Sequence, residues 1–172
     1  QHIEMTRDVA NRFNNIVGNV LVLPSAKVGD DTKLVPGTDG EKMSKSRNNT
    51  INIFLNDKKL RKQIMGIKTD SLGLEEPKNP NTDNVFALYK LIASEEQIEE
   101  MKAKYLAGNY GYGHAKQALF ELIIDKFSSV REKYHHFMTH KNEIDDALKI
   151  GAEKATEVAQ EVLQRVRSKI GY

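Results

Sequence analysis

The chain begins with an alternation of apolar and charged positions that predicts an amphipathic helix over residues 1–15. The apolar residues that can share one side of this helix are Ile3, Val9, Ala10 and Phe13. Gly18 and Asn19 are expected to end it. The short apolar run at residues 20–23, which Pro24 closes, predicts a buried strand.

Beyond residue 56, helical periodicity continues for most of the chain. Helices are expected at residues 58–67, 84–93, 94–106, 114–139 and 141–169. Asp57 is expected to cap the first of them, and Ser94 followed by Gln97 is a capping-box pattern. Glycine and proline in residues 72–84 predict an irregular connection. The last helix keeps its apolar residues on one stripe, so we expect it to pack along its whole length.

Residues 27–49 have the composition of a loop, with several Gly, Asp, Thr and Asn residues. The net charge of the chain is only +2, but residues 42–62 hold seven basic residues against one acid. This local surplus predicts an anionic partner, such as nucleotide phosphates or an RNA backbone. For the basic residues at 58–62 a solvated helix face is the alternative.

Composition narrows the class of protein. A chain of 172 residues can form one domain and part of a second. The absence of cysteine excludes disulfides and thiolate metal sites and fits a reducing compartment, so we expect a cytoplasmic protein. No stretch approaches the roughly 20 apolar residues that cross a bilayer. The chain opens on Gln1 without an initiator methionine or an apolar leader, so we expect a fragment of a longer protein.

The segment Lys42-Met43-Ser44-Lys45-Ser46 carries the most specific chemistry of the chain. Its two ammonium groups, two hydroxyls and backbone N–H donors can surround a triphosphate. Lysines suit a phosphate that is being transferred because they act as movable point charges. On chemistry alone, a solvated Lys/Ser loop remains the alternative.

This segment resembles the KMSKS signature of class I aminoacyl-tRNA synthetases, with all five letters intact. Further strings resemble bacterial tryptophanyl-tRNA synthetases in the same order. They are QHIEMTRD (residues 1–8), KTDS (68–71), GNYGYG (108–113), YHHFM (134–138) and GAEKA (151–155). The resemblance therefore spans the whole chain.

The resemblance implies a ligase that activates tryptophan with ATP, releases pyrophosphate and passes the amino acid to tRNA(Trp) in protein biosynthesis. It assigns Lys42 and Lys45 to phosphate binding and catalysis. Met43, Ser44 and Ser46 would complete the ATP-binding loop. The resemblance also places backbone contacts to adenine at Leu34 and Val35, and it implies Mg²⁺ bound with ATP.

The same resemblance implies that a HIGH-type motif and most of the L-tryptophan pocket lie upstream of Gln1. We therefore expect this fragment alone to be inactive, although the full-length protein is an enzyme and a homodimer. We also expect residues 30–49 to be poorly ordered or displaced, because the surfaces and the nucleotide that the loop contacts are missing.

The predicted fold is mainly α. Residues 1–56 are expected to be the end of a Rossmann-type α/β nucleotide-binding domain with the KMSKS loop, and residues 57–172 an all-helical anticodon-binding domain. A tyrosine-specific class I relative and a freestanding RNA-binding helical module are the alternatives. The strings at 134–138 and 151–155 argue against the first of these.

A pair of histidines and a pair of tyrosines could have functions other than those that the resemblance implies. His136 and His140 are four residues apart on a predicted helix, but we expect no protein metal site there, since histidine at a helix contact is the commoner arrangement. Tyr110 and Tyr112, set between glycines, could stack on a base or anchor a turn. We favour the anchor.

Overall fold

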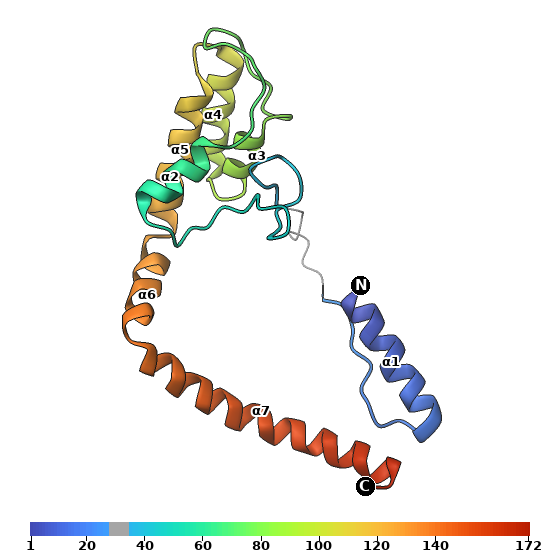
Figure 1. Ribbon diagram of the computed structural model, residues 1–172. Coiled ribbons are helices and arrows are strands. Elements are labelled where there is room, and N and C mark those ends of the chain that lie inside the picture. Colours follow the sequence, from blue (N-terminus) through green and yellow to red (C-terminus); the bar gives the residue numbers. More distant parts are fainter. Residues whose placement is uncertain (28–34) are drawn as a thin grey trace. The chain divides into compact units, whose positions relative to one another are not determined.

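The structure, a computed structural model, describes residues 1–27 and 35–172. Within these ranges it has seven helices and one isolated antiparallel β-bridge, between Pro36 and Lys42. The helices are α1 (His2–Val17), α2 (Asp57–Met65), α3 (Asn84–Lys90), α4 (Glu95–Ala107), α5 (Tyr112–Lys126), α6 (Ser128–Thr139) and α7 (Lys141–Ile170), as Figure 1 shows. The predicted mainly α fold is confirmed. Among the described residues, no helix has the length and apolar character to span a membrane.

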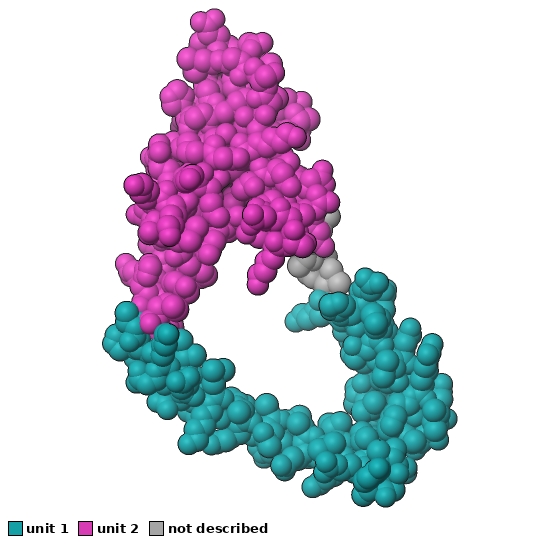
Figure 2. Space-filling model, viewed as in Figure 1, with its two compact units in different colours: residues 1–32, 139–172 teal, residues 33–138 magenta. Residues whose placement is uncertain are grey.

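The chain divides into two compact units, drawn in teal and magenta in Figure 2. Residues 1–32 and 139–172 form the first, which holds α1 and α7. Residues 33–138 form the second, which holds the KMSKS segment together with α2 to α5 and nearly all of α6. The domain boundary at residues 56 and 57 stays a prediction.

Helix α1 confirms the prediction from the apolar spacing and ends where glycine was expected to end it. Gly18 takes a φ of 92° and its N–H donates to the carbonyl of Asn14 at 2.9 Å. A positive φ of this size suits glycine, which has no Cβ to clash.

The strand expected at residues 20–23 is wrong, because a side chain takes the backbone groups that a strand partner would use. The Asn14 Oδ1 accepts from the N–H groups of Val20 and Leu21 at 3.1 and 2.9 Å, and its Nδ2 donates to the Leu21 carbonyl at 2.7 Å. Because Asn14 bonds these backbone groups of Val20 and Leu21, they do not need hydrogen bonds from a neighbouring strand.

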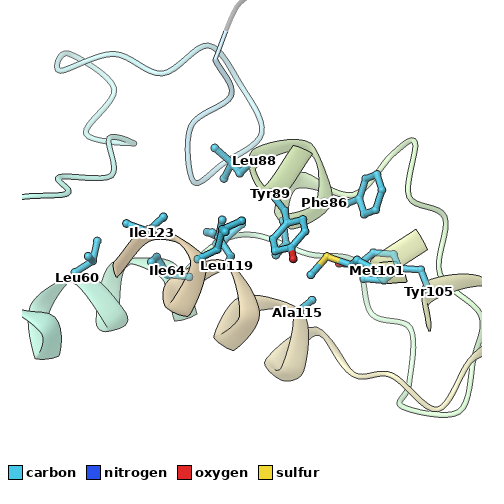
Figure 3. Close-up of a cluster of buried hydrophobic side chains, with 13 residues drawn as sticks. Leu60, Ile64, Phe86, Leu88, Tyr89, Met101, Tyr105, Ala115, Leu119 and Ile123 are labelled. Atoms are coloured by element: carbon cyan, nitrogen blue, oxygen red, sulfur yellow. The ribbon is translucent and has the colours of Figure 1, made fainter. Parts of the chain in front are cut away.

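A cluster of buried side chains from α2, α3, α4 and α5 forms the core of the second unit (Figure 3). Helix α5 packs against both α2 and α3, and α3 also contacts α4. The members with no exposed surface are Leu60, Ile64, Val85, Tyr105 and Ala115. Burying a large apolar side chain contributes roughly 1.5–3 kcal/mol, so this cluster is the main source of stability in the unit.

The buried hydroxyl of Tyr105 is paired within this core. It donates to Asp83 Oδ1 at 2.8 Å, and the same oxygen caps α3 by accepting from the N–H of Phe86 at 2.8 Å. Burial, and then the Asp83 carboxylate, raise the pKa of Tyr105, so that its hydroxyl remains a donor. One carboxylate thereby joins α3 to α4.

Lys78 is buried, with 1% of its surface exposed, and fastens the irregular connection before α3 to the core. Its Nζ donates to the carbonyls of Gly73 and Glu76 at 2.8 and 2.9 Å and lies 5.2 Å from the centroid of the Tyr112 ring. The Tyr112 hydroxyl donates to Asp70 at 2.7 Å. Tyr112 thus anchors a turn, as we favoured.

Several helix ends differ from the predictions by one to three residues. Asn56, not Asp57, caps α2 by accepting from the N–H of Lys59 at 3.0 Å. Asp57 instead pairs with Arg131 of α6. The capping box of α4, between Ser94 and Gln97, is confirmed.

The single long helix expected over residues 114–139 is wrong. Phe127 interrupts it with a φ of −105° and a ψ of 12°, and α6 begins at the next residue, Ser128. Phe127 packs against the core cluster, and α6 extends away from this cluster (Figure 1). The side chain of Phe54 stacks on Tyr134 of α6 with ring centroids 4.4 Å apart.

The packing expected along the whole of the last helix is also wrong. Helix α7 forms over Lys141–Ile170, but none of its residues is buried. Among its residues, helix α6 buries only Arg131, and the side chains of His135 and His136 are exposed. A 30-residue helix rich in good helix formers can persist on backbone hydrogen bonds and propensity, so periodicity predicted the helix correctly and its burial wrongly.

Candidate functional site

The KMSKS segment lies on a folded turn within the second unit. The β-bridge between Pro36 and Lys42 brings the chain back on itself, and the N–H of Met43 donates to the carbonyl of Val35 at 2.9 Å. Across the turn the N–H of Gly37 donates to the carbonyl of Glu41 at 2.6 Å. The signature therefore begins on a short hairpin.

Asn49, which follows the signature, is the centre of this turn and only 2% exposed. Its Nδ2 donates to Asp39 Oδ1 at 2.7 Å and to the carbonyl of Lys42 at 3.1 Å. Its Oδ1 accepts from the N–H of Ser44 at 2.8 Å. Its own carbonyl accepts from the N–H of Thr38 at 2.9 Å. One buried carboxamide thus holds the backbone on both sides of Met43.

Glycine is required where Asn49 approaches the turn. A Cβ on Gly37 would overlap the Asn49 side chain and lie 2.8 Å from its carbonyl oxygen. Gly40 has a φ of 86°, and a Cβ there would lie 2.5 Å from Oδ1 of Asn84. Both glycines therefore permit close approach, and Gly40 also permits a left-handed backbone.

Met43 faces the core and anchors the signature. It is partly buried against the core cluster and lines an apolar pocket of about 150 Å³ with Ile51, Ile53 and side chains of α3 and α5. The side chains before and after it remain accessible, since Lys42 and Lys45 are both exposed. The loop thus separates an apolar anchor from two cationic groups.

The hydroxyls of the signature are close together. Ser44 Oγ and Ser46 Oγ lie 3.3 Å apart, and Ser44 Oγ also accepts from the N–H of Arg47 at 3.3 Å. In the described part of the chain, neither Lys42 nor Lys45 forms an ion pair. Two uncompensated ammonium groups beside two hydroxyls can bind the oxygens of a polyphosphate.

The charge of Asp39 is part of the same turn. The hydrogen bond from Asn49 is the largest cause that holds the pKa of Asp39 below its usual value, and the backbone N–H of Glu41 acts in the same direction. Asp39 therefore stays ionised as an acceptor.

Lys42, Met43, Ser44, Lys45 and Ser46 all lie on this turn, and their assignment to ATP binding and catalysis stays a prediction. Val35 is 43% exposed, with its carbonyl engaged by the N–H of Met43, and Leu34 lies outside the described residues. Of the segment expected to be poorly ordered or displaced, residues 35–49 are described and form the hydrogen bonds of the turn, and residues 30–34 lie outside the described residues, so this expectation stays a prediction. The sequence analysis missed Asn49, because no local pattern marks a loop asparagine as buried.

A family model described as tRNA synthetases class I (W and Y) matches residues 1–128. The chain belongs to this family. The matched region covers α1 to α5 and includes every described residue of the candidate site.

Curated relatives extend the similarity beyond the family model. The chain is 45% identical over 172 residues to the tryptophan–tRNA ligase of Fusobacterium nucleatum, and 46% identical over 171 residues to that of Rhodopirellula baltica. Each alignment covers 99% of this chain and 53% of the relative. The chain thus spans about half the length of the relatives it matches.

The fold is similar to a solved member of the family. The crystal structure of tryptophanyl-tRNA synthetase from Campylobacter jejuni complexed with ADP and tryptophan matches with a TM-score of 0.89 and 43% identity. The match covers 99% of this chain and 54% of that structure.

Proposed function

We propose that this chain is the part of a tryptophan–tRNA ligase that supplies the ATP-phosphate loop and the helical tRNA-binding region. The observation that carries this proposal is the KMSKS turn. Asn49 fixes its backbone, and two exposed lysines at its surface form no ion pair with any described residue. Similarity to tryptophan–tRNA ligases over 99% of the chain supports the choice of amino acid.

In the complete enzyme a tryptophan carboxylate oxygen attacks the α-phosphorus of ATP. The bond from that phosphorus to the bridging oxygen breaks, and pyrophosphate leaves with the electron pair. Lys42 and Lys45 stabilise the negative charge that develops on the leaving pyrophosphate. Their exposed ammonium groups can reach phosphate oxygens because neither is tied to a carboxylate in the part of the chain that is described.

The remaining site residues have supporting roles. Met43 holds the loop on the core, while Ser44 and Ser46 offer hydroxyl hydrogen bonds to the phosphates. The backbone of Leu34 and Val35 makes the contacts to adenine. Mg²⁺ arrives bound to ATP, since lysines neutralise phosphate charge but do not coordinate a cation.

The rest of the function depends on residues beyond this chain. Most of the tryptophan pocket and the HIGH-type motif belong to the other half of the enzyme, so residues 1–172 alone cannot hold the carboxylate against ATP. The helical region, residues 57–172, contacts tRNA(Trp), and the full-length protein acts as a homodimer in the cytoplasm.

The experiment is amino-acid-dependent ATP–pyrophosphate exchange with the full-length protein. Exchange with tryptophan and not with tyrosine is expected. Exchange with tyrosine alone would identify a tyrosine-specific member of the same family. Absence of exchange with either amino acid, together with tRNA binding, would favour a freestanding RNA-binding module.

A further inference from the structure

Asp39 and Gly40 lie at the tip of the KMSKS turn, and the peptide junction between them is chemically distinct within this sequence. Of the eleven glycines in the chain, Gly40 alone follows an aspartate or an asparagine. At such a junction the glycine nitrogen can approach the side-chain carboxyl group with little steric hindrance, because glycine has no Cβ. The product of that attack is a cyclic imide, which opens to aspartate or to isoaspartate.

The fold of the turn requires both residues of this junction. The Asp39 carboxylate accepts from Asn49 Nδ2 at 2.7 Å and from the N–H of Glu41 at 3.0 Å. Gly40 has a φ of 86°, and a Cβ there would lie 2.5 Å from Asn84 Oδ1. A side chain at position 40 would hinder the cyclisation, but the contact with Asn84 leaves no room for one. The reactive junction is therefore built into the turn.

Hydrogen bonds hold both reacting groups while the turn is closed. The Gly40 N–H donates to the Gly37 carbonyl at 3.1 Å, and Asn49 and Glu41 hold the carboxylate. The bond from Asn49 also holds the pKa of Asp39 below its usual value, so the carboxyl group is ionised and a weak electrophile at neutral pH. Gly40 is exposed and Asp39 is only partly buried, so local opening of the turn frees both groups without unfolding the core.

We propose that the Asp39–Gly40 junction is a site of spontaneous isoaspartate formation whose rate is set by opening of the KMSKS turn. In the open turn the Gly40 nitrogen bonds to Cγ of Asp39. One carboxyl oxygen leaves as water, with the Gly40 amide proton and a second proton from the carboxyl group or the solvent. Water then adds to the imide. Cleavage of the bond from nitrogen to Cγ restores aspartate, and cleavage of the bond from nitrogen to the main-chain carbonyl carbon yields isoaspartate.

The isomer changes the turn permanently. Isoaspartate routes the backbone through the former side chain, which inserts one methylene between residues 37 and 41 and leaves the former main-chain carboxyl group as a free carboxylate. The insertion falls inside the hairpin that the bond from the Gly37 N–H to the Glu41 carbonyl closes. The Cγ oxygen that Asn49 bonds becomes part of a peptide group. The amides of Met43 and Ser44 should therefore lose protection from hydrogen exchange in the isomerised molecules.

The test follows residue 39 in the nucleotide-free full-length protein during incubation at neutral pH. Trypsin releases residues 34–42 as one peptide, and a protease that cleaves before aspartate cuts this peptide only where residue 39 is unmodified. The wild type should form isoaspartate more slowly than a free peptide of the same sequence. A wild type that reacts as fast as the free peptide would overturn the inference, because the turn would then control nothing.

Asn49→Ala is the variant that opens the turn. It removes the three hydrogen bonds that the side chain makes to Asp39, Lys42 and Ser44. Isoaspartate should form roughly 30-fold faster or more, with the rate of the free peptide as the upper limit. A rate equal to that of the wild type would overturn the inference.

Asp70 is an internal control for general unfolding. It lies in the same unit, is followed by the small residue Ser71, and is likewise held, by the Tyr112 hydroxyl at 2.7 Å and the N–H of Leu72 at 3.0 Å. Its isomerisation should be the same in Asn49→Ala and in the wild type. An equal rise at residues 39 and 70 would overturn the inference, because it would reflect unfolding of the whole unit.

A double variant tests the chemistry of the junction itself. Adding Gly40→Ala to Asn49→Ala places a Cβ beside the attacking nitrogen in a turn that is already open, so most of the gain in rate should be lost. Isoaspartate formation as fast as in Asn49→Ala would overturn the role of the Asp-Gly junction.

The inference does not depend on the proposed function, because isoaspartate is identified from the covalent structure of residue 39. Absence of isoaspartate in Asn49→Ala, while the free peptide converts, would overturn the modification site and leave the ligase intact. Absence of pyrophosphate exchange with either amino acid, in a protein that forms isoaspartate at residue 39 as expected, would refute the ligase and support the modification site.

Discussion

Replacing Asn49 by alanine should open the KMSKS turn without unfolding the helices around it. The side chain makes three hydrogen bonds, to Asp39, Lys42 and Ser44, while it is 2% exposed. Each net hydrogen bond contributes about 0.5–1.5 kcal/mol, so the loss is about 2–4 kcal/mol of local stability. At 1.4 kcal/mol for each factor of ten, the open form becomes roughly 30- to 1000-fold more populated.

Amide hydrogen exchange on this chain measures that population. The N–H groups of Met43 and Ser44 are bonded to the Val35 carbonyl and to Asn49, so their exchange should accelerate by that factor. The amides of α5 serve as the internal reference and should not change. Asn49→Asp keeps the acceptor for Ser44 but places a carboxylate against Asp39, so it should open the turn at neutral pH as well. Wild-type exchange at Met43 and Ser44 in Asn49→Ala would refute the role assigned to Asn49.

Three further outcomes are expected. Lys45→Ala in the full-length enzyme should raise the barrier to tryptophan activation by about 2–4 kcal/mol, measured by pyrophosphate exchange, with little change in tryptophan affinity, measured by binding. Weaker tryptophan binding with unchanged turnover would contradict the role assigned to Lys45. Gly40→Ala should destabilise the turn by about 1–3 kcal/mol, because its φ is 86° and a Cβ meets Asn84, and thermal melting that matches the wild type would count against this. The hydrogen bond from Asn49 lowers the pKa of Asp39, so the contribution of Asp39 to the stability of the turn is complete above the ordinary value of 3.8 and is lost as the pH falls through the lowered pKa. Hydrogen exchange of the Ser44 amide should therefore accelerate only in that acid range. Acceleration between neutral pH and the ordinary value would contradict this.

The sequence was informative where structure is local or carried by a specific string. Apolar spacing located α1, and the Ser94–Gln97 pair located the start of α4, because both signals act over one or two helical turns. The KMSKS letters located the candidate site, since that combination is the signature of class I aminoacyl-tRNA synthetases. These features depend little on distant residues.

The features that the sequence did not predict depend on contacts between distant positions. Asn49 reaches Asp39, ten residues earlier, and the buried Lys78 places its ammonium over the ring of Tyr112, so neither role follows from its neighbours in the chain. Residues 20–23 have strand composition, but Asn14 bonds the backbone N–H groups of Val20 and Leu21 and the carbonyl of Leu21. For α7 the apolar stripe predicts a partner surface, and composition alone does not say whether the described chain supplies one.

The KMSKS turn is fastened to the helical region rather than hinged on it. The N–H of Lys68 donates to the carbonyl of Thr38 at 2.7 Å, Asn84 at the start of α3 closes over Gly40, and Met43 sits against the core. Hydrogen bonds and apolar contacts thus join the turn to the unit that α2 to α5 form. A displacement of these helices would carry the two signature lysines with it.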